Sequence, residues 1–133
     1  MAAVLALLVA GCGRASPESV LVERTPPPCQ VHAPGACRVG CDVAEPTRLR
    51  QVAPDLSGLS LNGLRGIEIV EVLVDAGGDV QDVCLLRGVR EDIDGRTVAA
   101  VRQWRFTPAR LRHSTPPGLP VSIVMSVSVP IGG

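Results

Sequence analysis

The sequence has no lysine, no tyrosine and no net charge. Its 133 residues carry 13 basic side chains, all of them arginine, against 13 acidic ones. A protein that binds nucleic acid needs an excess of positive charge, so we expect no nucleic-acid partner. Aromatic residues make up 2% of the chain, namely Trp104 and Phe106. A platform on which bases or sugars stack is therefore not expected.

Signatures of catalysis are also missing. The chain contains no G-x-S-x-G, no H-E-x-x-H and no phosphate-binding loop. Its two histidines, His32 and His113, lie far apart in polar segments with no nucleophile pattern beside them. We therefore expect no enzymatic activity, no catalytic residues, no metal and no cofactor.

The N-terminus is a short apolar run, Ala2 to Ala10, about half as long as a membrane-spanning helix. This length is typical of a secretory signal peptide. The run ends in Leu8-Val9-Ala10-Gly11-Cys12, which resembles a bacterial lipobox. The resemblance implies a signal peptide over residues 1–11 and a lipid on Cys12, hence a periplasm-facing protein of the cell envelope. Gly13 in place of Asp favours the outer membrane over the inner. An ordinary signal peptide cleaved near Gly11 is the alternative.

The segment that follows is rich in proline and cysteine. Six of the twelve prolines fall between Pro17 and Pro46, and they interrupt helices and strand ladders. We predict a lipid-anchored linker over residues 12–45 and a folded domain over residues 46–133. With Cys12 acylated, four cysteines remain, an even number in an exported protein. We expect one local bridge among Cys29, Cys37 and Cys41, and one bridge from this group to Cys84. A metal site that uses His32, or a free buried Cys84, are the alternatives.

Within the domain, residues 67–74 are rich in β-branched side chains and end at a glycine turn, which predicts a strand entering a hairpin. The second strand covers residues 80–86, with a bulge near Asp82. Apolar residues at steps of three and four from Ile93 to Trp104 predict a helix of about eleven residues. Asp92 or Asp94 can cap its start, and Pro108 lies beyond its end.

The last strand has the clearest pattern. One face is apolar and the other nearly all serine, over Val121, Ser122, Ile123, Val124, Met125, Ser126, Val127, Ser128 and Val129. Pro120 and Pro130 bound it. The predicted order is β-β-α-β, and the predicted fold class is α+β: a small three-stranded antiparallel sheet with one helix packed on one face.

Residues 66–131 resemble the C-terminal domain of TonB-family energy transducers. Gly66 opens a valine-rich strand that ends in Asp75, and a restart at Gly78-Asp79-Val80 follows. The family's characteristic stretch is matched by Trp104-Arg105-Phe106-Thr107-Pro108-Ala109, and its G-x-P-V by Gly118-Leu119-Pro120-Val121. In place of the family's transmembrane helix and long periplasmic stretch, we expect a lipid anchor and a short linker.

The resemblance implies a module that binds a short extended segment of an outer-membrane transporter by adding a strand to its sheet. We expect the partner along residues 121–128, and a secretin-like protein is a further candidate partner. Alternatively, residues 46–56 cap this edge, or the domain pairs with a second copy as a structural component of the envelope.

Overall fold

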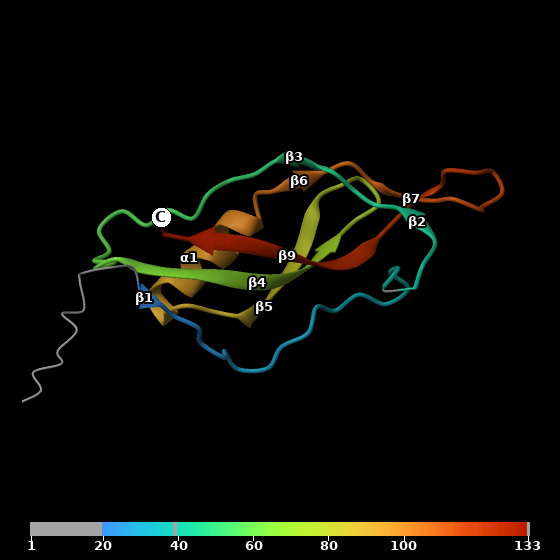
Figure 1. Ribbon diagram of the computed structural model, residues 1–133. Helices are drawn as coiled ribbons and strands as arrows, with labels where there is room; N and C mark the ends of the chain where they lie inside the picture. Colours follow the sequence, from blue (N-terminus) through green and yellow to red (C-terminus); the bar gives the residue numbers. More distant parts are fainter. Residues whose placement is uncertain (1–19, 39, 133) are drawn as a thin grey trace, which may run out of the picture.

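A sheet of three antiparallel strands forms the centre of the molecule (Figure 1). In this computed structural model, which describes residues 20–38 and 40–132, the central strand is β4 (Leu64–Val74). It pairs with β5 (Val80–Arg87) on one side and with β9 (Ile123–Ile131) on the other. The helix α1 (Glu91–Val101) packs on one face. The predicted α+β fold is confirmed.

Strands β4 and β5 form the predicted hairpin. The Asp75 carboxylate closes the turn by accepting hydrogen bonds at 2.9 Å from the backbone N–H groups of Gly77 and Asp79. The register shifts where Leu73 faces Asp82 and Val74 faces Val80. This is the bulge predicted near Asp82, and it lets Val80 and Val83 both pack against the core.

Strand β9 pairs with β4 along its whole length, from Ile123 opposite Val74 to Ile131 opposite Gly66. It continues through Pro130, so the predicted boundary at this proline is wrong. Proline is tolerated because position 130 directs its backbone away from β4, where no N–H is needed for pairing. Val121 belongs to a separate short strand, β8 (Pro120–Val121).

The helix has the predicted length, but it ends at Val101, before Trp104, and its start also differs from the prediction. Arg90 is the N-cap residue, and its side chain makes no capping bond. Asp94 instead reaches back to accept hydrogen bonds from the backbone N–H groups of Val89, at 2.9 Å, and Arg90, at 3.3 Å. A carboxylate inside the first turn can cap the helix because the N–H groups of the cap residue and of the residue before it have no partner within the helix.

Short strands complete the fold beside the sheet. Strand β7 (Ala109–Leu111) lies between β2 (Val43–Ala44) and β8, and β3 (Arg48–Arg50) pairs with β6 (Arg105–Phe106). Figure 1 shows residues 46–62 passing above the sheet on their way from β2 to β4. These connections close the core on the side of α1.

The segment before residue 46 is folded against the sheet over its described residues. Strand β1 (Val20–Leu21) pairs in parallel with the start of β4, and Arg24 exchanges two backbone hydrogen bonds of 2.7 Å with Gly88. Disulfides join Cys29 to Cys84 and Cys37 to Cys41. The structure thus contains the predicted local bridge and the predicted staple to Cys84, in place of a metal site or a free Cys84 thiol. Residues 20–38 and 40–45, assigned to the linker from sequence, are part of the fold.

Candidate functional site

The three-stranded sheet has two edge strands, β5 and β9, and the predicted docking strand forms the outer edge of β9. Val124 shows which residues point outward, because its N–H bonds to Cys37 on the side away from β4. By strand alternation, Ser126, Ser128 and Pro130 also direct their backbone groups outward. Among residues 20–38 and 40–132, no strand pairs with these three positions. Among the same residues, the N–H groups of Ser126 and Ser128 and the C=O groups of Val124, Ser126, Ser128 and Pro130 have no backbone partner and can pair with an added strand.

The start of this edge is covered by the N-terminal segment. Cys37 donates its N–H to the C=O of Ser122 and accepts from the N–H of Val124, both at 2.8 Å. The predicted alternative cap, residues 46–56, does not pair with β9: its strand β3 pairs with β6. Of the predicted edge residues 121–128, residues 20–38 and 40–132 therefore leave the part from Met125 onward uncovered.

The same segment covers part of the sheet face opposite α1. Val31 packs in this layer with Cys84 and Val124, and all three are buried. Its N–H also donates to the carboxylate of Glu71 on that face, at 3.3 Å. The contact explains why Val124 is buried although it stands on the predicted serine face.

A hollow of about 410 Å³ lies where this segment meets β9. It is lined by apolar side chains of Val43, Ile123 and Met125 and, at its rim, by the charged residues Arg38 and Glu45. Because Ser126 also lines it, the hollow adjoins the first free position of the edge. A side chain carried by an added strand would find an apolar floor there.

The motif residues build the core beneath this edge. Trp104 is 1% exposed; its indole N–H donates to the C=O of Val52 at 2.8 Å, and the guanidinium of Arg48 lies 4.8 Å from its ring centroid. Phe106 packs beside it with ring centroids 6.3 Å apart. Arg105 forms an ion pair of 3.0 Å with Asp79. These contacts are structural.

The remaining motif residues lie in connections. Pro108 stands between β6 and β7, while Pro120 opens β8 and pairs with Arg110. Gly118 adopts a positive φ of 78° where the loop returns to β8, and its C=O accepts a hydrogen bond of 2.9 Å from the Arg110 guanidinium. Cys12 lies outside the described residues.

Sequence reasoning missed a buried acid. Glu68 is fully buried in β4 and faces α1, and neither carboxylate oxygen has a hydrogen-bond partner among the described residues. Burial, and then the neighbouring acid Asp94, raise the pKa of Glu68 to about 8. Arg24 from the N-terminal segment pairs with Asp94 at 2.5 Å. The sequence signal for this buried acid is that Glu68 alternates with Val70, Val72 and Val74, which face inward on the same strand.

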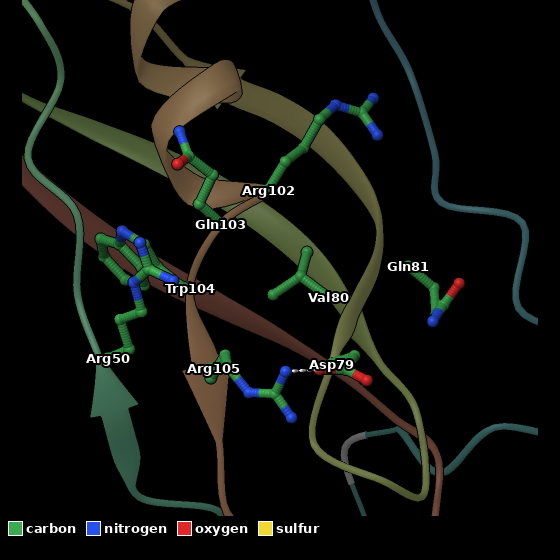
Figure 2. Close-up of a pocket in the computed structure, with 8 residues that line it drawn as sticks. All are labelled: Arg50, Asp79, Val80, Gln81, Arg102, Gln103, Trp104 and Arg105. Atoms are coloured by element: carbon green, nitrogen blue, oxygen red, sulfur yellow. Dashed lines mark ion pairs between the residues drawn. The ribbon is translucent and has the colours of Figure 1, made fainter.

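A second hollow, of about 450 Å³, lies between β3, β5 and the end of α1 (Figure 2). Figure 2 shows that the arginines around it diverge: Arg105 turns to Asp79, while Arg102 extends away from the pocket floor. No nucleophile and base converge here. In the part of the chain that the structure describes, no three metal-binding side chains gather in one place. No helix there is long and apolar enough to span a membrane.

These observations define a small α+β module whose reactive feature is an open strand edge. The family model described as Gram-negative bacterial TonB protein C-terminal matches residues 60–126, and the chain belongs to this family. Domains of this family are protein-interaction modules of envelope transport, which bind partners such as outer-membrane transporters. No curated protein matches the chain.

Proposed function

We propose that this chain is a lipid-anchored, periplasm-facing adaptor of TonB-type envelope transport, which binds its partner by strand addition along β9. The observation that carries the proposal is that no strand among the described residues pairs with the outward backbone of Ser126 and Ser128. Each backbone hydrogen bond that a partner strand forms there contributes about 0.5–1.5 kcal/mol.

The edge also limits what can bind. Its free part starts after the N–H of Val124, which bonds to Cys37, and finishes at Pro130, which has no N–H to donate. The outward positions from Val124 to Pro130 span about 20 Å, enough for a short extended segment. The side chains of Ser126 and Ser128 are small and uncharged, so recognition along this face rests on the backbone more than on charge.

The anchor places this edge close to a membrane. Residues 13–19 alone separate Cys12 from β1, a distance of at most about 28 Å in a fully extended chain. The proposed adaptor therefore works next to its own membrane, where an outer-membrane transporter or a secretin-like protein presents its periplasmic segments. Mass spectrometry of the mature protein tests the anchor: an acylated Cys12 is expected, and an unmodified N-terminus near Gly11 contradicts it.

Photo-crosslinking in living cells tests the docking edge. A photoreactive amino acid at Ser126 of the full chain should capture a transporter or secretin, while the same group at Gln103, exposed at the end of α1, should not. Capture of only a second copy of this chain would favour the alternative, a structural component that self-associates through β9. No specific product from Ser126 would contradict docking at this edge.

A further inference from the structure

The N-terminal segment already begins a strand on β9. Cys37 forms a parallel bridge with Ile123. It donates a hydrogen bond to the C=O of Ser122 and accepts one from the N–H of Val124. This pair of bonds is the repeating unit of a parallel ladder. The segment thus occupies the first outward position of the edge in a register that could continue.

The sequence after Cys37 suits such a continuation. In this register, Cys41 would stand beside Val127 on the core face, and Gly40 beside Ser126 on the opposite face. Cys41 would then lie on the apolar face of β9 and the small Gly40 on its serine face, as strand alternation requires. Nothing in the local pattern forbids pairing beyond Cys37.

The structure shows the chain turning away instead. The N–H of Cys41 donates to the C=O of Arg38 at 3.1 Å, which closes a turn. The disulfide holds the Cα atoms of Cys37 and Cys41 at 5.7 Å, whereas four residues of extended strand span about 13 Å. The bridge and an extended strand through these residues are therefore mutually exclusive.

We propose that the Cys37–Cys41 disulfide keeps the β9 edge open by stopping the chain's own N-terminal segment from pairing along it. The disulfide prevents residues 37–41 from extending along β9 and so leaves Ser126 and Ser128 to a partner. The consequence of this disulfide for partner binding rests on the function proposed above. Its effect on the β9 edge can be measured without any partner.

Amide hydrogen exchange at Ser126 in the full chain is the test. Ser126 is the next outward N–H after Val124, so the shortest extension of the pairing would protect it. In the double variant Cys37→Ser/Cys41→Ser, exchange at Ser126 should slow by at least about tenfold relative to the wild type. The matched control Cys29→Ser/Cys84→Ser removes the other disulfide and should leave this rate unchanged. An unchanged or faster rate at Ser126 in the first variant overturns the proposal.

A second variant and a second measurement guard against misfolding. In Cys37→Ser/Val39→Pro/Cys41→Ser, residue 39 has no N–H to donate to the C=O of Val124, a bond that this register needs before Ser126 can pair, and the rate should return toward that of the wild type. If Cys37→Ser/Cys41→Ser does not fold, a small dithiol can reduce the remaining bridge of folded Cys29→Ser/Cys84→Ser protein, and Ser126 should then exchange more slowly. Slow exchange together with no crosslinked partner would contradict the proposed function and leave this inference standing.

Discussion

The most quantitative prediction concerns Glu68. The carboxyl is neutral in the folded protein up to about pH 8, because burial and then Asp94 raise its pKa, whereas in the unfolded chain it ionises near 4.5. Between these values the folded state binds one proton more than the unfolded state, so stability falls as the pH rises. The slope is about 1.4 kcal/mol per pH unit, and the full shift corresponds to roughly 4–5 kcal/mol.

The variant Glu68→Gln removes this titration while keeping the size of the side chain. Urea unfolding followed by the fluorescence of Trp104, the single tryptophan, should give a wild type that is clearly less stable at pH 8 than at pH 5. The variant should be nearly flat over the same range. Carboxyls such as Asp92, whose pKa the hydrogen bonds from Arg90 lower, lose their contribution only in more acidic solution.

Glu91→Gln is the matched control, because Glu91 is exposed at the start of α1 and should leave the wild-type slope intact. A wild type whose unfolding midpoint is the same at pH 5 and pH 8 would refute the reasoning. So would a Glu68→Gln variant that keeps the slope.

Two further predictions concern the core and the disulfides. Trp104→Ala should cost about 3–5 kcal/mol, because the ring is buried and its N–H is bonded; a denaturation midpoint equal to that of the wild type would remove Trp104 from the core. Loss of the Cys29–Cys84 bridge, which closes a loop of 55 residues, should lower the free energy of unfolding by roughly 4 kcal/mol. Loss of the Cys37–Cys41 bridge, which closes a loop of 4 residues, should lower it by roughly 2 kcal/mol. Equal losses of free energy of unfolding in the two double serine variants would contradict this ranking.

Local patterns predicted the parts of the fold that depend on local physics. The alternation in β9, the helical spacing from Ile93 onward and the bulge near Asp82 all follow from which side chains must face one core. The short spacing of Cys29, Cys37 and Cys41 predicted one local bridge and one bridge to Cys84, but not that Cys29 is the partner of Cys84.

Contacts between distant segments could not be predicted in this way. The N-terminal segment reads as a linker because its prolines exclude regular structure, yet Val31 packs on the sheet and Arg24 pairs with Gly88 and Asp94. For the same reason, the sequence did not predict that Cys37 pairs with the start of the proposed docking edge. Cys37 thus covers the start of the predicted docking strand, and docking along its remaining residues stays a prediction.

The central claim is that a partner adds a strand along β9, and the affinity of Ser126→Pro tests it most directly. The ligand is a synthetic peptide of the transporter segment that crosslinks to position 126, and Ser126→Ala, which keeps the N–H, is the control. Pro130 shows that an outward position of β9 accepts proline, so the fold should persist. We predict that Ser126→Pro binds about 5- to 100-fold more weakly than the wild type, a loss of about 1–3 kcal/mol, and that Ser126→Ala binds normally. A folded Ser126→Pro variant that binds as tightly as the wild type would contradict strand addition at this edge.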